Sequence, residues 1–193
     1  MATLYLFIVG VLSLVFFEPI KTAYVHGDPS LVWRFVTLFT HMVSHGSWDH
    51  LIGNFSFGAP FMIYLENKLK DTKKFVRLFF AIGLCSFLFQ CIFNTITFFP
   101  AMGLIGSSGA IFGLVGAALM LYDGPKPLRI AAKMVTFLYV FSQFQLARAS
   151  LYWPMGTAYA AHLGGLLAGI TFSLHHRRHL LHRLKSLANR IRK

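Results

Sequence analysis

Two side chains of complementary chemistry lie inside separate apolar stretches of this sequence. Ser108 stands in the run Gly106-Ser107-Ser108-Gly109, which opens one stretch, and His162 lies just inside the start of another. A serine hydroxyl becomes a nucleophile when an adjacent base takes its proton, and histidine has suitable basicity near neutral pH. Polar groups are costly in hydrocarbon and are usually kept there for function. The pair predicts nucleophilic catalysis by a Ser-His dyad, because the last apolar stretch holds no carboxylate to complete a triad.

The sequence also offers donors for the oxyanion that attack on a carbonyl would create. Backbone N–H groups at the start of the helix expected after Ser107 have no partner within that helix. His50 and Asn54 are four residues apart, so their side chains share one face of a helix. We expect these groups together to stabilise the developing negative charge.

The histidines allow a second interpretation. His41, His45 and His50 follow one another at spacings of four and five, and with His162 nearby they could bind zinc or haem. No Asp, Glu or Cys completes a His-Glu-x-x-His helix here, which argues against zinc. Otherwise, His41 and His45 would hydrogen-bond to loop backbone and hold an external connection in shape. We expect no metal and no organic cofactor, while the spacing alone leaves histidine ligation open.

Membrane-spanning helices must position these residues. Of the 193 residues, 56% are hydrophobic and 12% are charged, which is typical of an integral membrane protein. We expect an all-α, polytopic domain of six transmembrane helices over residues 1–175 and a basic amphipathic cytoplasmic tail over 176–193. The apolar runs on which this count rests fall at about 3–17, 51–65, 75–99, 104–122, 128–147 and 157–174.

Positive charge is distributed unevenly between the connections. Of the 18 Lys and Arg residues, all but Lys21, Arg34 and Arg148 lie near the second and fourth connections or after the sixth run. This bias places both termini in the cytoplasm. Orientation and attraction to anionic lipid explain the net charge of +12, so we expect membrane lipids and no nucleic acid as partners. His50, Asn54, Ser108 and His162 then lie within roughly 10 Å of the external membrane boundary.

Small residues indicate how the serine and the histidine could meet. Two runs contain stripes with the spacing that lets membrane helices approach closely. The stripes are Gly109, Gly113 and Ala117 in one run, and Ala161, Gly165 and Gly169 in the other. Ser108 directly precedes the first stripe, and His162 follows the first residue of the second. If the two stripes pack together, the hydroxyl and the imidazole come into contact.

These residues together resemble the rhomboid family of intramembrane serine proteases. The resemblance implies a six-helix core in which Ser108 is the nucleophile and His162 the general base, with an oxyanion hole formed by His50, Asn54 and the Ser108 backbone N–H. The matching segments run through nearly the whole chain in the family's order. They are Trp33-Arg34, His41-x3-His45-x4-His50-x3-Asn54, Gly106-x-Ser108-Gly109 and Ala161-His162-x2-Gly165-x3-Gly169.

The resemblance implies further features of the structure. The loop carrying Trp33-Arg34 would lie sideways in the membrane, and Glu66, at the cytoplasmic end of the second helix, is similar to a structural acidic position of the family. Phe112, one helical turn after Ser108, stands where some members carry a tyrosine that packs on the catalytic histidine.

Substrates implied by the resemblance are other membrane proteins, cut in or near a transmembrane segment and entering between the second and fifth helices. The chain looks like the minimal form common in bacteria, which suggests a bacterial inner membrane. A non-catalytic adaptor or chaperone that binds transmembrane segments is the alternative, although both Ser108 and His162 are present. A transporter would predict inverted repeats and charges at mid-membrane, and the sequence has neither.

Overall fold

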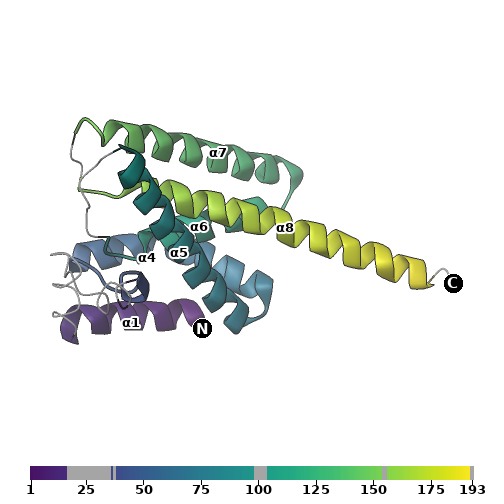
Figure 1. Ribbon diagram of the computed structural model, residues 1–193. Helices are drawn as coiled ribbons and strands as arrows, with labels where there is room; N and C mark the ends of the chain where they lie inside the picture. The colour runs from purple at the N-terminus through teal and green to yellow at the C-terminus, as the bar shows by residue number, and fades with distance from the viewer. Residues whose placement is uncertain (17–35, 37, 98–103, 154–155, 192–193) are drawn as a thin grey trace.

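The computed structural model describes residues 1–16, 36, 38–97, 104–153 and 156–191, with side chains described as far as residue 178. Within the described residues, each of the six predicted apolar runs overlaps a helix, so the prediction of an all-helical fold is confirmed there. The helices whose bounds lie within the described residues are α1 (Ala2–Phe16), α4 (Trp48–Leu69), α5 (Thr72–Thr97), α6 (Ser108–Leu121), α7 (Lys126–Ala149) and α8 (Tyr159–Ile191) (Figure 1). Of these, α5 and α7 are long and apolar enough to cross a membrane, whereas α1 and α6 are apolar but shorter.

The short helix α6 forms the centre of the bundle. Ten of its 14 residues are buried, and it packs against α4, α5, α7 and α8. A helix that is apolar on all sides is expected to be buried on all sides, which is what α6 shows. Ser108, its first residue, is therefore carried by the most enclosed helix among the described elements.

The backbones of α6 and α8 touch through their glycines. A Cβ atom on Gly165 would overlap the carbonyl oxygen of Gly109, and one on Gly169 would overlap the carbonyl oxygen of Gly113. Only residues without side chains permit so close an approach. The two small-residue stripes therefore lie against each other.

The last helix, α8, continues from the bundle into the basic tail without a break (Figure 1). Beyond the bundle it extends away from the other helices. The Arg177 guanidinium donates to the carbonyl of Met120 near the end of α6, so the first residues of the tail still contact the core. The division between residues 175 and 176 thus falls inside a single helix, and it stays a prediction based on composition.

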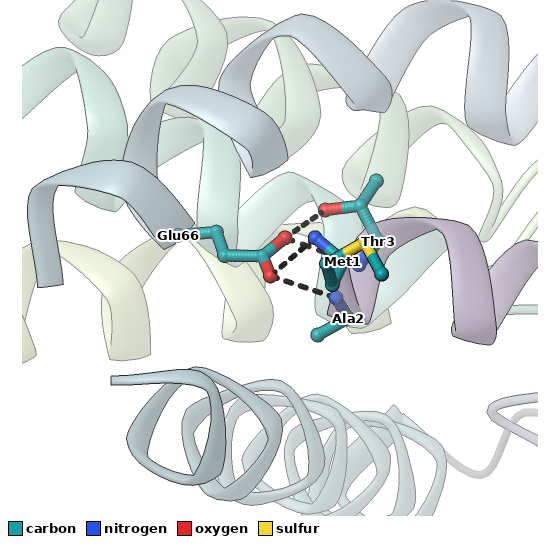
Figure 2. Close-up of polar contacts among 4 residues, drawn as sticks. All are labelled: Met1, Ala2, Thr3 and Glu66. Carbon is teal, nitrogen blue, oxygen red and sulfur yellow. Dashed lines mark hydrogen bonds and ion pairs between the residues drawn. The ribbon is translucent and has the colours of Figure 1, made fainter. Parts of the chain in front are cut away.

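The carboxylate of Glu66, near the end of α4, holds the first turn of α1 (Figure 2). Its Oε1 accepts from the Ala2 N–H at 2.7 Å and lies 2.8 Å from the Met1 ammonium nitrogen, while its Oε2 accepts from the Thr3 N–H at 3.2 Å and the Thr3 hydroxyl at 3.0 Å. The first N–H groups of a helix have no intrahelical partners and favour a negative charge. One side chain therefore joins the ends of two helices.

The contact between α6 and α8 predicts that Gly165→Ala is destabilising. The added methyl group meets the Gly109 carbonyl, and we expect the free energy of unfolding to fall by about 2 kcal/mol, as for other overpacked cores. Reversible unfolding in detergent micelles would measure it. Gly53→Ala is the matched control, because a Cβ there meets no atom within 4 Å. Equal stability of the two variants would contradict a direct backbone contact.

The hydrogen bonds from the start of α1 to Glu66 predict that substitution of Glu66 is also destabilising. Glu66→Ala leaves the Ala2 and Thr3 N–H groups without their acceptor, and we expect a loss of about 2 kcal/mol in the same unfolding measurement. Glu66→Gln should lose less, because its carbonyl oxygen still accepts. Asn67 is the exposed neighbour of Glu66, and Asn67→Ala serves as the control. If Glu66→Ala unfolds like this control, Glu66 does not hold α1.

Candidate active site

The starts of α6 and α8 bring a serine and a histidine together. Ser108 is the first residue of α6, and His162 lies in the first turn of α8. The distance from His162 Nε2 to Ser108 Oγ is 2.9 Å, which is that of a hydrogen bond. His162 is buried, and Ser108 is partly exposed. The imidazole is placed to accept the proton of the hydroxyl.

Both side chains line a cavity of about 330 Å³. His50 and Asn54 from α4, Gly106 from the loop before α6, and Phe112 line the same cavity. Its volume is at the small end of the range of ligand pockets. The four residues that were predicted to lie at a similar membrane depth therefore line the same cavity: His50, Asn54, Ser108 and His162.

The loop at Gly106 lets the two α4 side chains approach Ser108. A Cβ on Gly106 would lie 2.8 Å from His50 Nε2 and 3.4 Å from Asn54 Nδ2, so both nitrogens converge on this residue. Its φ of +110° is in the region that favours glycine. The Gly106 N–H donates to the His41 carbonyl at 2.9 Å, which fixes the loop.

The side-chain nitrogen of Asn54 is buried and has no hydrogen-bond partner among the described residues. A buried donor without a partner costs about 1–3 kcal/mol. Such a group in a cavity wall is ready to donate to an oxygen that enters the cavity. Asn54 therefore gives the site a preorganised donor near the serine.

His45 supports the turn before Ser108. Its Nε2 lies 3.1 Å from Ser107 Oγ, and its Nδ1 lies 3.3 Å from the Val43 carbonyl oxygen. Burial and the neighbouring His50 lower the pKa of His45 to about 4, so the ring is neutral near pH 7. With Nδ1 donating to the carbonyl, Nε2 accepts from the Ser107 hydroxyl. This contact ties the loop that carries His45 to the residue next to Ser108.

The histidines do not assemble a metal site in the part of the chain that the structure describes. No group of three or more His, Cys, Asp or Glu side chains there is arranged to hold an ion. The ring of His41 lies against Phe87, with centroids 5.3 Å apart. The spacing of the histidines alone was compatible with metal binding. In the structure, His41 contacts a neighbouring ring, and His45 contacts atoms of the loops.

A ring from α6 lies flat on the imidazole. Phe112 and His162 stack with centroids 4.3 Å apart and an angle of 11° between planes. The ring of Phe57 from α4 lies 5.3 Å from that of Phe112 and supports it. The stack restricts the tilt of the His162 ring toward Ser108.

The family model of the rhomboid domain matches residues 30–179, which is most of the chain and includes every cavity residue named above. This protein belongs to the rhomboid family. Rhomboid proteins are integral membrane proteins, and many of them are serine proteases. Among curated proteins, no sequence matches this one significantly.

Two polar residues of α5 hold the start of α8 in this rhomboid, and sequence analysis did not single them out. Ser86 Oγ donates to the Ala161 carbonyl at 2.8 Å, and Gln90 Oε1 accepts from the Ala161 N–H at 2.9 Å. These contacts fix the backbone next to His162. The available signal was a pair of polar residues, four apart, within an apolar run.

A further partner of the histidine was not predicted from the sequence. Gln143 Oε1, from α7, lies 3.1 Å from His162 Nδ1. The last apolar run holds no carboxylate that could orient the ring, whereas this amide comes from the run before it. Of the remaining predicted positions, Trp33 and Arg34 lie outside the described residues of the rhomboid domain.

The stack on His162 predicts how the reactivity of Ser108 depends on Phe112. Phe112→Leu should slow the labelling of Ser108 by a fluorophosphonate about 2- to 10-fold, the range expected for one aromatic contact. Phe112→Tyr keeps the ring and should label at the wild-type rate. A mass-spectrometric time course measures both. Phe172→Leu is the control, because Phe172 stacks on His176 instead. Wild-type labelling of Phe112→Leu would contradict a role for the stack.

Proposed function

We propose that this rhomboid is an intramembrane serine endopeptidase, which hydrolyses peptide bonds in or near transmembrane segments of other membrane proteins. The observation that carries the proposal is the 2.9 Å contact between His162 Nε2 and Ser108 Oγ in the cavity wall. The unpaired amide nitrogen of Asn54 in the same wall supports it. No organic cofactor or metal ion takes part in the proposed reaction.

The first half of the reaction forms an acyl-enzyme. His162 Nε2 takes the proton of Ser108 while Oγ attacks the carbonyl carbon of the scissile bond. The carbonyl oxygen becomes an oxyanion and accepts hydrogen bonds from Asn54 Nδ2, His50 Nε2 and the Ser108 N–H. The tetrahedral intermediate collapses, the C–N bond breaks, and His162 gives its proton to the leaving amine.

The second half releases the acyl group to water. His162, now neutral, takes a proton from a water molecule, and the hydroxide attacks the ester carbon. The same donors hold the second oxyanion. The bond to Ser108 Oγ then breaks, and the proton on His162 returns to the serine. One water is consumed, and the products are a carboxylate and an amine terminus.

The arrangement of the helices supports a site close to one membrane surface. We propose six transmembrane helices with both termini in the cytoplasm of a bacterial cell, as the positive charge of the connections indicates. The first two turns of α4, α6 and α8 carry four of the polar side chains that line the cavity, so in this orientation the cavity opens toward the external face. Water then reaches Ser108 without crossing the bilayer.

Transmembrane substrates would enter the site laterally, between α4 and α7. In the described residues these helices touch through side chains, with the rings of Phe57 and Tyr139 6.0 Å apart, while their backbones do not approach closely. Large apolar side chains such as Phe137 and Phe141 are exposed on α7 and would contact lipid. A gap closed only by side chains can widen without breaking a helix contact.

The proposal predicts the cleavage activity of four variants. Ser108→Ala and His162→Ala should abolish cleavage of a transmembrane reporter in proteoliposomes, and Asn54→Ala should lower kcat about 100-fold. Asn67→Ala, an exposed asparagine on the same helix, should leave kcat unchanged. A chelator should have no effect.

Three results would overturn parts of this account. Cleavage by Ser108→Ala would exclude the serine mechanism. Loss of cleavage on chelation would restore the metal interpretation of the histidines. Binding of the reporter without cleavage by the wild-type protein would favour the adaptor.

A further inference from the structure

One polar side chain of α7, that of Gln143, contacts His162 on α8. Four residues of α7 are buried, and three of them are small: Ala132, Thr136 and Ala147. Thr136 satisfies its hydroxyl within α7, by donating to the Ala132 carbonyl at 2.9 Å. The fourth, Gln143, is 6% exposed and extends across the helix interface, where its Oε1 lies 3.1 Å from His162 Nδ1.

A buried amide in a membrane protein requires a partner. Moving such a group from water into an apolar environment costs several kcal/mol when no hydrogen bond replaces those to water. An apolar residue of similar size would satisfy packing at this position without that cost. The hydrogen bond to the His162 imidazole thus accounts for an amide at this buried position.

The contact decides which nitrogen of His162 carries the proton. In a neutral imidazole one nitrogen donates and the other accepts. The carbonyl oxygen of Gln143 can only accept, so Nδ1 carries the hydrogen and the lone pair of Nε2 faces Ser108. The opposite tautomer would place a hydrogen between Nε2 and the hydroxyl, and the base could not take the proton.

The stacked ring of Phe112 cannot make this choice. Phe112 stacks flat on the imidazole and limits its tilt, but a stacked ring has no preference between the two tautomers. A ring flip would leave the stack intact and would exchange Nδ1 with Cδ2. The flip would also exchange Nε2 with Cε1, so the hydrogen bonds to Gln143 and to Ser108 both oppose it.

We propose that Gln143 is a positioning residue, which holds His162 in the Nδ1–H tautomer and acts through it on Ser108. The inference rests on the proposed protease function. In a Ser-His-Asp triad a carboxylate holds this position. Here a neutral amide does so, and no charge has to be buried between α7 and α8. This role makes α7 part of the catalytic apparatus.

A purely structural role is the competing explanation, in which the hydrogen bond only attaches α7 to α8. Two substitutions separate the roles. Gln143→Met keeps the length of the side chain and removes the acceptor, whereas Gln143→Glu keeps an acceptor at the same reach. Gln145→Met removes an amide from the other side of α7, and Thr136→Val alters the same buried face of α7 two turns away from Gln143.

Kinetics with the full chain in proteoliposomes form the first arm of the test. We expect Gln143→Met to lower kcat roughly 10- to 100-fold with KM within about twofold of wild type, because the base and not substrate binding is impaired. Gln143→Glu should restore kcat to within about threefold. Gln145→Met and Thr136→Val should cleave at the wild-type rate. Wild-type kcat in Gln143→Met would overturn the proposal.

Nitrogen-15 NMR of histidine-labelled protein forms the second arm and does not require activity. The His162 signals, identified by their loss in His162→Ala, should show a protonated Nδ1 and an unprotonated Nε2 in wild type and Ser108→Ala. Gln143→Met should show both tautomers. A protonated Nε2 in wild type would overturn the inference. If the wild-type protein cleaves nothing, the proposed function fails, and the spectrum alone then decides whether Gln143 positions His162.

Discussion

The direct contact between the backbones of α6 and α8 is the constraint on which the site depends. Ser108 opens α6 and His162 lies in the first turn of α8, so the register between Gly109 and Gly165 sets the distance between hydroxyl and imidazole. A side chain at this crossing would move the helices apart and separate the pair. The glycines set how closely the two helices approach, and the other contacts of the site orient the side chains.

Polar side chains from every neighbouring helix converge on that crossing. Ser86 and Gln90 hold the backbone of Ala161, and Gln143 reaches the outer nitrogen of His162. Each of these groups finds a partner on another helix, as polar groups in an apolar environment must. The nitrogen of Asn54 is the exception among the described side chains, and it lies in the cavity wall. Unsatisfied groups are expected where function requires them.

The helices and the serine-histidine pair could be predicted from the sequence because they follow from local patterns. Apolar runs determine the helices, and the spacing of Gly109 and Gly165 determines which faces pack. Gln143 could not be predicted, because one amide in an apolar run does not reveal its partner on another helix. The histidines before α4 were ambiguous for the same reason: spacing shows that His45 could be a ligand, and only the fold shows that it contacts Ser107.

The most direct test of the account is a crystal structure of the protein after reaction with a fluorophosphonate, whose phosphonyl oxygen occupies the place of the oxyanion. We expect phosphorus bonded to Ser108 Oγ, with the phosphonyl oxygen about 3 Å from Asn54 Nδ2, His50 Nε2 and the Ser108 backbone nitrogen. An adduct on another residue would contradict it. So would an oxygen turned away from α4 that leaves the Asn54 nitrogen without a partner.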